Sequence, residues 1–407
     1  MNLPLEEGLK TEQGVTIVGV PLDNMTMQSA IDRIEGYIEE GGFHQVATAN
    51  VNFLVNSLRH PELQSVLGSC DMVVPDGMPL LWISRQMHLP LRERVTGVDM
   101  VPHLARLSAE KGYGIYLLGA VESSSNAAVA ALEKMHPGVR IVGRHCPPYL
   151  PLDEMDNEDI LRRIRAARPD ILLVAFGNPK QEIWLARHRH RLHVPVCIGI
   201  GGSLNMISGI VPRSPERFQR LGIEWLYRAS REPGRLIGRY LSDFFGLLTP
   251  LARQMLAFAR QGERKPLFEG AAVQLTGATL IPLAGGLSGY DCPELEQQIL
   301  LNRLGSSHVI LDLAGLNYMD GIAITRLIRL ANRLHNNGSG LWLVNARAAV
   351  LRILRTSGAS SRAGSLLYVL PSVQEALERI AALSATPHYD GHEVLSGLHA
   401  KAFYQTT

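Results

Sequence analysis

Apolar and polar residues alternate along the first 200 positions in a pattern typical of a sheet covered by helices. Short apolar runs, each followed by a polar or glycine-containing loop, occupy residues 45–48, 72–74, 114–118, 141–143, 171–176 and 196–199. Stretches with helical periodicity separate them, for example residues 123–135 and 157–167, and both of these end near a proline. Strand-like runs that alternate with helices predict a Rossmann-like parallel sheet with helices on both faces.

The pattern changes twice in the second half of the chain. From residue 215 to about 261 it is helical, and a new alternation begins after residue 266, with strands expected at 271–275, 279–283, 309–313, 341–345 and 366–370 and helices at 293–304, 322–336, 348–355 and 373–383. We therefore expect four segments: a Rossmann-like domain (1–212), a basic helical appendage (213–265), a smaller α/β domain (266–384) and a tail (385–407).

Composition excludes several classes of protein. With 407 residues, 46% apolar and 19% charged, the chain is globular and long enough for two to three domains. No run reaches the roughly 18 uncharged apolar residues of a spanning helix, and the acidic start is unlike a signal peptide, so we expect a cytoplasmic protein. The four cysteines are scattered without a Cys-x-x-Cys pair, which argues against a zinc ribbon, a redox motif or a disulfide framework.

Charge is concentrated in the expected appendage. The whole chain has a formal net charge of +2, but residues 213–265 hold eleven basic residues against five acidic ones, a local net charge of +6. Such a segment suits phosphate groups or an anionic membrane surface, and a solvated basic face is the alternative. The segment is rich in leucine and carries no nucleic-acid-binding motif, so we do not expect nucleic acid as a partner.

Polar side chains follow the first two predicted strands, where open α/β sheets bind their ligands. Thr48 and Asn50 come after the first strand and suit sugar hydroxyls, although both residue types also cap helices. Asp76 stands between Pro75 and Gly77 after the second strand, where its carboxylate is a candidate general base. The alternative for Asp76 is a helix N-cap. Arg94 adds a cation near the same edge.

Two later loops suit a nucleotide diphosphate. Gly177, Gln181 and Glu182 follow the apolar run 171–176, and Gly201 belongs to a glycine cluster after the last strand. Leu204 stands where a dinucleotide fingerprint needs its third glycine, which disfavours a hydride-transferring enzyme with NAD. The chain contains no Asp-x-Asp, so we expect no metal and no other cofactor, with arginines neutralising the phosphates.

Taken together, these motifs closely resemble those of the WecG/TagA/CpsF family of bacterial glycosyltransferases over the first 250 or so positions. The shared motifs, in family order, are Thr48-x-Asn50, Pro75-Asp76-Gly77, Val95-Thr96-Gly97-x-Asp99, Phe176-Gly177-x-Pro179-Lys180-Gln181-Glu182-x-Trp184, Gly199-x-Gly201-Gly202, and Gly222-Ile223-Glu224-Trp225-Leu226-Tyr227-Arg228 followed by Glu232-Pro233 and Arg235.

The resemblance implies a reaction. The family transfers a sugar, often N-acetylmannosamine or its uronate, from a UDP donor to a polyprenyl-diphosphate-linked acceptor at the inner face of the membrane, with inversion. This implies a protein peripherally associated with that face and active in surface polysaccharide synthesis.

The resemblance also implies residue roles. Asp76 would be the base, Thr48 and Asn50 would position sugar hydroxyls, and Arg94 would lie near the acceptor. Gly177, Gln181, Glu182 and Gly201 would hold the donor nucleotide, and Arg228, Arg231 and Arg235 would face diphosphate charge. The family commonly has Phe-Asp where this chain has Leu204-Asn205, so Asn205 replaces a carboxylate in the donor site and makes the donor less certain than the reaction.

Residues after 270 resemble a STAS domain, the fold of anti-sigma-factor antagonists, through the motifs Val309-Ile310-Leu311-Asp312-Leu313 and Asn317-Tyr318-Met319-Asp320-Gly321. In that family a phosphorylated serine often follows the aspartate, and here the residue is Gly321. We therefore expect a constitutive module for self-association or partner binding, dispensable for sugar transfer, with Arg326, Arg329 and Arg333 facing outward or contacting a partner.

Two other functions compete with an inverting UDP-sugar hexosyltransferase. One is a STAS-type regulatory protein whose first domain binds a nucleotide sugar without turnover, and Asp76 argues against it because a sensor needs no accessible base. The other, an NAD-linked oxidoreductase acting on nucleotide sugars, lacks the early glycine fingerprint.

Overall fold

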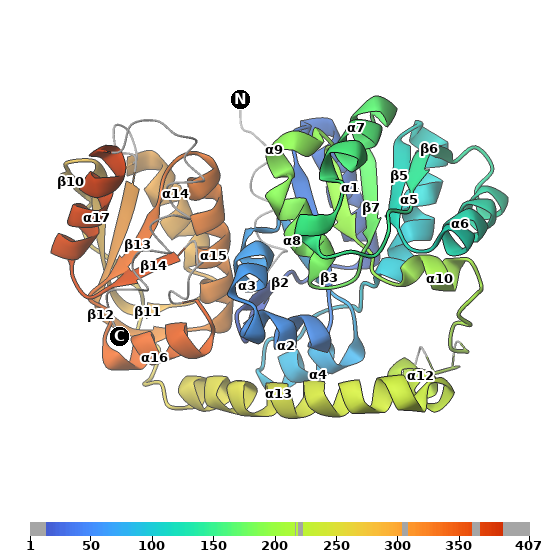
Figure 1. Cartoon of the computed structure of the whole chain (residues 1–407). Coiled ribbons are helices and arrows are strands. Elements are labelled where there is room, and N and C mark those ends of the chain that lie inside the picture. Colours follow the sequence, from blue (N-terminus) through green and yellow to red (C-terminus); the bar gives the residue numbers. More distant parts are fainter. Residues whose placement is uncertain (1–13, 216, 219–222, 303–307, 360–366, 386–407) are drawn as a thin grey trace. The chain divides into compact units, whose positions relative to one another are not determined.

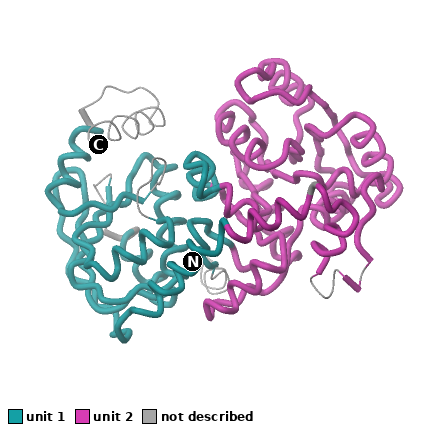
Figure 2. The backbone as a smooth tube through the Cα atoms, turned by 60° about the horizontal axis from the view of Figure 1, so that its bottom comes forward, with its two compact units in different colours: residues 1–22, 57–69, 246–407 teal, residues 23–56, 70–245 magenta. Residues whose placement is uncertain are grey.

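The structure is a computed structural model that describes residues 14–215, 217–218, 223–302, 308–359 and 367–385 (Figure 1). Within these ranges the side chains of Arg235, residues 300–302 and residues 384–385 are not described. The chain forms two compact units: unit 1 comprises residues 1–22, 57–69 and 246–407, and unit 2 comprises residues 23–56 and 70–245 (Figure 2). The two compact units are defined by contacts in space and include segments that are distant in the sequence. They therefore do not test the four expected segments, which remain predictions.

Unit 2 contains the predicted parallel sheet. Its strand order is β4-β3-β8-β7-β5-β6, and every neighbouring pair is parallel. The strands are β3 (His44–Ala49), β4 (Met72–Pro75), β5 (Gly114–Gly119), β6 (Arg140–His145), β7 (Ile171–Ala175) and β8 (Val196–Gly199). All six lie where the apolar runs predict them, because strands buried on both faces are nearly continuous in apolar residues.

Helices cover both faces of this sheet. On one face, Ile171 and Leu173 of β7 pack in a core with α1 (Met27–Glu40), α5 (Gly97–Lys111) and α6 (Glu122–Met135). On the other face, Leu172 and Val174 pack in a second core with α7 (Asn157–Ala167), α8 (Lys180–Arg187) and α9 (Arg189–Leu192). Successive residues of a strand point to opposite faces, so one strand supplies both cores.

The strand order reverses direction between β3 and β8, and this point positions the site. The chain moves outward from β3 to β4, whereas β8 and β7 lie on the other side of β3. In open α/β sheets the ligand crevice lies beside such a reversal, outside the carboxyl ends of the strands. The remaining elements of unit 2 or its borders are α2 (Val51–Arg59), α4 (Met78–Gln86), the 3-10 helix Leu152–Glu154, α10 (Ser203–Ile207) and α12 (Glu224–Arg231).

Unit 1 contains a second α/β sheet with the STAS-like order of elements. Strands β11 (Ala278–Leu287), β12 (His308–Met319), β13 (Leu341–Val344) and β14 (Leu367–Leu370) are parallel, and β9 (Phe268–Glu269) and β10 (Val273–Leu275) are antiparallel to β11. Helices α14 (Cys292–Asn302), α15 (Gly321–Asn336) and α16 (Ala348–Thr356) pack on one face and α17 (Val373–Ala385) on the other. From residue 386 on, the expected tail lies outside the described residues.

Two segments from the beginning of the chain also belong to unit 1. They are the antiparallel hairpin β1 (Val15–Ile17) and β2 (Val20–Leu22), and helix α3 (Pro61–Ser69). The sequence pattern did not predict that these segments belong to the same unit as the second sheet.

Helix α13 (Pro233–Ala259) is 27 residues long and continues through Pro250, although a proline inside a helix favours a kink or break. In the sequence, apolar residues recur at three- and four-residue steps and predict one apolar side: Leu236, Tyr240, Phe244, Leu247, Leu251, Met255 and Phe258. Leu236 and Leu247 of this set are buried, whereas Phe244 is exposed. An exposed apolar stripe overlaps the predicted side at Phe244. It consists of Ile237, Leu241, Phe244, Phe245 and Leu248, whose exposed fractions run from 47% to 66%.

Candidate active site

Asp76 lies at the carboxyl end of β4, beside the end of β3. Its backbone N–H donates to the carbonyl of Ala49 at 2.7 Å, and Ala49 and Pro75 are register partners in the two strands. The N-cap residue of α4 is Gly77, which makes no side-chain cap bond, so Asp76 is not the helix cap considered as an alternative. The φ of +146° at Gly77 is a conformation that other residues rarely adopt, and it fixes the turn behind the carboxyl.

The carboxyl of Asp76 has an unusual charge environment. Burial raises its pKa from 3.8 to about 7, opposed by the positive charges of Arg94 and Arg228 and assisted by the negative charges of Glu224 and Asp99. A carboxyl with a pKa near 7 changes its protonation state near neutral pH, which suits a general base. Perturbed carboxyls of this kind are concentrated at functional sites.

Arg94 is fixed beside this carboxyl by two acids. Its Nη1 donates to Oε2 of Glu224 at 2.8 Å, and its Nη2 lies 3.9 Å from Oδ2 of Asp99. Asp99 in turn accepts a hydrogen bond from the hydroxyl of Thr96, the N-cap of α5, and forms an ion pair with Arg213. The guanidinium of Arg94 is thereby held in one orientation instead of moving in solvent.

Thr48 and Asn50 lie at the end of β3, and both make hydrogen bonds within the protein. The buried hydroxyl of Thr48 donates to the carbonyl of Gly199 at 3.2 Å and joins β3 to β8. The Oδ1 of Asn50 accepts from the backbone N–H groups of Asn52 and Phe53, so it caps α2. The capping alternative is therefore realised for Asn50, and Thr48 positions the strand ends.

Gln181 joins the two loops assigned to the donor. Its Oε1 accepts from the backbone N–H of Gly177 at 3.1 Å and from that of Gly201 at 3.0 Å. Its Nε2 donates to Oε1 of Glu182 at 2.6 Å. Both Gln181 and Glu182 are only 1% exposed, so their side chains do not present a surface to a nucleotide. Gln181 holds the two glycine loops together and Glu182 supports Gln181, and their role toward the donor remains a prediction.

The packing behind these loops requires glycine. A Cβ at Gly199 would lie 2.5 Å from Nε2 of Gln181 and 2.6 Å from Oε1 of Glu182, closer than nonbonded atoms approach. The pKa of Glu182 is raised by burial from 4.5 to about 7, opposed by its hydrogen bonds from Gln181 and Asn178. The strand end after β8 and the start of α8 therefore form one closely packed polar cluster.

A chain of hydrogen bonds that the sequence did not reveal continues from this cluster to α13. Asn178 donates to Oε2 of Glu182 at 2.9 Å, and its own Oδ1 accepts from Nδ2 of Asn56 at 2.7 Å. The same Nδ2 lies 3.1 Å from Oδ1 of Asn52, whose Nδ2 donates to the buried carboxylate of Asp243 at 3.1 Å. Five side chains from α2, α8, α13 and the loop before α8 therefore form a continuous polar connection.

The remaining residues expected in the site lie on three helices. Asn205 is partly buried on α10, and Arg228 on α12 lies close enough to lower the pKa of Asp76. Arg231 is exposed at the end of α12, with its guanidinium 5.8 Å from the ring centroid of Tyr227. Arg235 lies on α13, and its side chain is outside the described part of the chain.

A cavity of about 570 Å³ adjoins this group of charges in unit 2. Arg94 and Asp99 line it, together with Arg213 and the α5 residues His103 and Arg106. The arginines Arg106 and Arg213 therefore line the cavity together with Arg94, whose guanidinium also lowers the pKa of Asp76. In the described residues, no group of three or more His, Cys, Asp or Glu is arranged to hold a metal ion.

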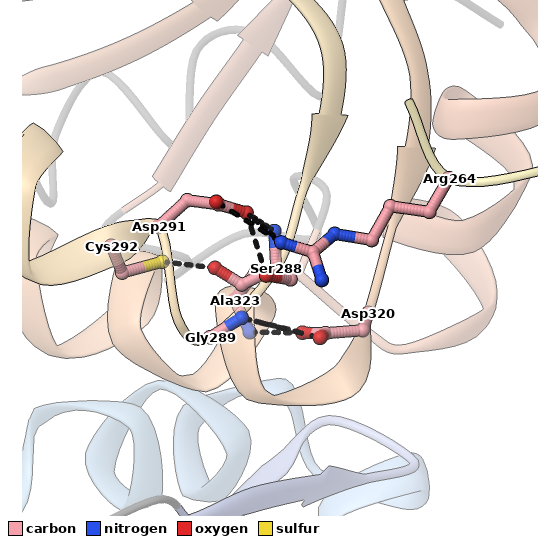
Figure 3. Close-up of polar contacts among 7 residues, drawn as sticks. All are labelled: Arg264, Ser288, Gly289, Asp291, Cys292, Asp320 and Ala323. Carbon is pink, nitrogen blue, oxygen red and sulfur yellow. Dashed lines mark hydrogen bonds and ion pairs between the residues drawn. The ribbon is translucent and has the colours of Figure 1, made fainter. Parts of the chain in front are cut away.

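The STAS-like part has its own polar cluster at the start of α15 (Figure 3). Asp320 accepts from the backbone N–H of Ala323 at 2.7 Å and from that of Gly289 at 3.1 Å. Asp291 accepts from the hydroxyl of Ser288 at 2.6 Å and from Nη2 of Arg264 at 3.1 Å. Gly321, at the position where STAS domains often have a phosphorylated serine, is buried in the first turn of α15. The loop before α14 and the start of α15 are thus tied together.

Comparison with known families divides the chain in two. The model of the glycosyl transferase WecG/TagA/CpsF family matches residues 15–261, and the STAS domain model matches residues 271–376. The first match covers more than half of the chain and contains every expected site residue.

Individual relatives agree with the family matches. A Staphylococcus aureus (strain MW2) protein named N-acetylglucosaminyldiphosphoundecaprenol N-acetyl-beta-D-mannosaminyltransferase is 29% identical over 242 residues, covering 59% of this chain and 92% of the relative. A protein of the same name from strain NCTC 8325 / PS 47 is 29% identical over 229 residues, covering 56% and 88%.

Solved structures with similarity to this chain include two anti-sigma factor antagonists. An anti-sigma factor antagonist from Thermotoga maritima is 13% identical, with a TM-score of 0.24 and coverage of 27% of this chain and 93% of that one. An anti-sigma factor antagonist from Mycobacterium paratuberculosis is 17% identical, with a TM-score of 0.25 and coverage of 29% and 99%.

Proposed function

The chain belongs to the WecG/TagA/CpsF family of glycosyl transferases, and we propose that it transfers an N-acetylmannosamine-type sugar, or a related hexose, from a UDP donor with inversion. It is a hexosyltransferase of cell-surface polysaccharide synthesis that acts on a polyprenyl-diphosphate-linked acceptor. The observation that carries the proposed mechanism is the Asp76 carboxyl, whose pKa is about 7 at the end of a parallel strand.

In the proposed reaction Asp76 is the base. Its carboxylate accepts the proton of the acceptor hydroxyl as the hydroxyl oxygen forms a bond to the anomeric carbon of the donor sugar. The bond from that carbon to the UDP oxygen breaks on the opposite side, and UDP leaves with the bonding electron pair. A single displacement of this kind inverts the anomeric centre, and the proton remains on Asp76 until solvent removes it.

We assign the phosphate charge to arginines. Arg94 and Arg228 both act electrostatically on Asp76, so they are close to the reacting atoms. Guanidinium groups bind phosphate oxygens in pairs and keep their charge at every physiological pH. Arg231 follows at the end of α12 and Arg235 lies in α13, and we propose that both bind the acceptor diphosphate. We propose that no metal ion is needed.

We propose that the donor nucleotide binds at the backbone of the two glycine loops. Gln181 brings the N–H groups of Gly177 and Gly201 to a single oxygen, so these loops are held together before any ligand binds. Such preorganisation reduces the entropy lost on binding. Asn205, which replaces a carboxylate common in the family, follows the second loop on α10, and we propose that it alters donor selection.

The exposed stripe of α13 supports peripheral binding to the inner face of the membrane. An amphipathic helix with basic residues beside exposed aromatic and aliphatic ones lies in the surface of an anionic membrane. Phe245 and Leu241 supply the apolar part, and Arg239 is exposed on the same helix. No helix in the described ranges is long and apolar enough to span a bilayer. The lipid-linked acceptor is itself held at a membrane surface.

A role in self-association or partner binding remains a proposal for the STAS-like domain. Arg326 and Arg333 both form ion pairs with Glu296 of α14, but the side chain of Arg333 is 55% exposed and faces outward as expected, whereas that of Arg326 is 11% exposed. Arg329 donates to the carbonyl of Pro21 at 3.4 Å. Arg333 therefore remains exposed to a partner or to a second copy of the chain.

The stereochemistry of the product tests the proposed reaction. We expect the full chain to convert an α-linked UDP-sugar into a β-linked product on an N-acetylglucosaminyl diphosphate lipid, as read from the one-bond C1–H1 coupling constant in NMR. A product with the donor's α configuration contradicts single displacement. A panel of UDP-sugars in the same assay identifies the preferred donor.

A further inference from the structure

Helix α15 of the STAS domain packs on its own sheet with one side, and a second side of the helix is also buried. Eleven of its sixteen residues are buried. Ile324, Leu327, Ala331 and Leu334 belong to the apolar core beneath the sheet. Thr325 and Asn332 are buried polar residues outside that core, and they share a face with Arg329 because the three follow one another at steps of four and three residues.

This second face of α15 contacts the hairpin β1–β2 in the same compact unit. The hydroxyls of Thr325 and Thr16 lie 2.8 Å apart. Thr325 donates its one proton to the carbonyl of Gly321, so Thr16 is the donor in the contact between the two hydroxyls. All six residues of β1 and β2 are buried, as are both of these threonines. A two-stranded hairpin is marginal alone and needs such a cover.

Gln254 of α13 closes the other side of the hairpin. Its Oε1 accepts from the backbone N–H of Val18 and its Nε2 donates to the carbonyl of Thr16, both at 2.8 Å. The same Nε2 lies 3.3 Å from the hydroxyl of Ser357, which follows α16 of the STAS domain. Gln254 is fully buried, so each of these bonds replaces a bond to water.

The turn of the hairpin is fitted to the end of α16. A Cβ at Gly358 would lie 2.6 Å from the Cα of Gly19, and both glycines have positive φ. Only glycine allows two backbones to approach this closely. Helix α3 completes the contact, because Asn332 donates to the carbonyl of Ser69 at 2.9 Å and Gln64 donates to the carbonyl of Gly358 at 3.3 Å.

The hairpin β1–β2 and helix α3 both lead directly to β4, the strand that Asp76 follows. The hairpin ends at Leu22, and the next residue, Asp23, bonds Val73 of β4 twice: through its N–H at 2.8 Å and its carboxylate at 2.6 Å. Helix α3 ends at Ser69, and the chain enters β4 at Met72. The two segments that contact the STAS domain are therefore attached to β4 by a hydrogen-bonded residue and by the chain itself.

We propose that the STAS domain binds its own chain, with the α15 face formed by Thr325, Arg329 and Asn332 as the docking surface for the hairpin β1–β2 and helix α3, and that this docking positions strand β4 and its Asp76. Thr325 and Asn332 are then positioning residues for the transferase. This contradicts the expectation that the domain is dispensable for sugar transfer. The part of the inference that concerns catalysis rests on the proposed function, and the part that concerns docking does not.

The test compares full-length variants by hydrogen exchange and by kinetics. Thr325→Val and Asn332→Leu remove the two side-chain hydrogen bonds with little change in volume, and Asn336→Ala, at an exposed position of the same helix, is the matched control. Losing a buried hydrogen bond increases local opening roughly tenfold. We expect faster amide exchange in residues 15–22 and in 72–74 for the two variants, and no change in either segment for the control.

Kinetics separate positioning from substrate binding. In the same two variants we expect kcat to fall several-fold while the KM for the UDP donor is unchanged, because Asp76 is displaced and the donor loops are not. Exchange that is unchanged in residues 15–22 refutes the docking. Exchange that rises in the hairpin while residues 72–74 and kcat stay unchanged refutes the link to β4. If the wild type itself has no transferase activity, the proposed function fails and exchange alone decides on the docking.

Discussion

Replacing Asp76 by asparagine is expected to lower activity and raise stability at the same time. Asparagine has nearly the same shape as the carboxylate but neither accepts the proton of the acceptor nor carries charge. Loss of a general base costs roughly 10²–10⁴-fold in rate. We expect kcat to fall within this range while the affinity for the UDP donor is retained.

The gain in stability follows from the pKa of the carboxyl. Burial raises that pKa from 3.8 to about 7 in the folded protein. Below about pH 4 the folded and unfolded states both hold the proton, and the carboxyl adds no pH-dependent penalty. Between about pH 4 and pH 7 the unfolded state loses the proton first, so stability falls as pH rises. Above pH 7 the penalty is complete, and at 1.36 kcal/mol for each unit of pKa it amounts to about 4 kcal/mol as an upper value.

Urea unfolding of wild type and Asp76→Asn at pH 4 and pH 8 measures this penalty. The variant is expected to exceed the wild type in free energy of unfolding by one to about 4 kcal/mol at pH 8 and by much less at pH 4. In the wild type, kcat/KM is expected to rise with pH through about 7, since the base must be unprotonated. Equal stability of the two proteins at pH 8 refutes the raised pKa of the carboxyl, and near-normal turnover by the variant refutes its role as base.

Three further predictions concern the metal, the donor loop and the membrane. Activity is expected to survive EDTA treatment and desalting, and a requirement for added Mg²⁺ or Mn²⁺ would exclude neutralisation by arginines alone. Asn56→Leu removes the 2.7 Å bond to the donor loop and is expected to raise the KM for the donor up to roughly tenfold, with unchanged KM in steady-state kinetics arguing against the polar connection. Leu241→Glu with Phe245→Glu is expected to abolish flotation with anionic liposomes, whereas Val121→Glu, at an exposed apolar position away from α12 and α13, leaves flotation intact. Retained flotation of the double variant would exclude α13 as the membrane contact.

Local sequence patterns predicted both sheets because each strand carries its own signal. Parallel strands buried on both faces are short apolar runs, and the loops at their carboxyl ends carry the polar residues of the site. Asp76 and the glycine loops were found in this way. The same reasoning gave the order of strands and helices in the STAS domain without any long-range information.

The roles of individual side chains depended on burial, which a motif does not reveal. Gln181 and Glu182 lie in the motif predicted to hold the donor, but both are buried, and Gln181 bonds the backbone of the two glycine loops. The link from Asn52 to Asp243 joins residues 191 positions apart, and each alone is an ordinary polar residue of a helix. The contact of Thr16 with Thr325 spans 309 positions, so the sequence of the hairpin does not indicate that α15 covers it.

Acceptor-dependent UDP release tests the central claim most directly. The purified full chain is supplied with UDP-N-acetylmannosamine, with and without an N-acetylglucosaminyl diphosphate lipid, and both UDP and lipid-linked product are quantified. A transferase with Asp76 as base releases UDP in step with a disaccharide lipid only when the acceptor is present, and the Asp76→Asn variant loses most of this release. Donor binding without acceptor-dependent release, across the panel of UDP-sugars, would contradict the account and favour a nucleotide-sugar-binding regulatory protein.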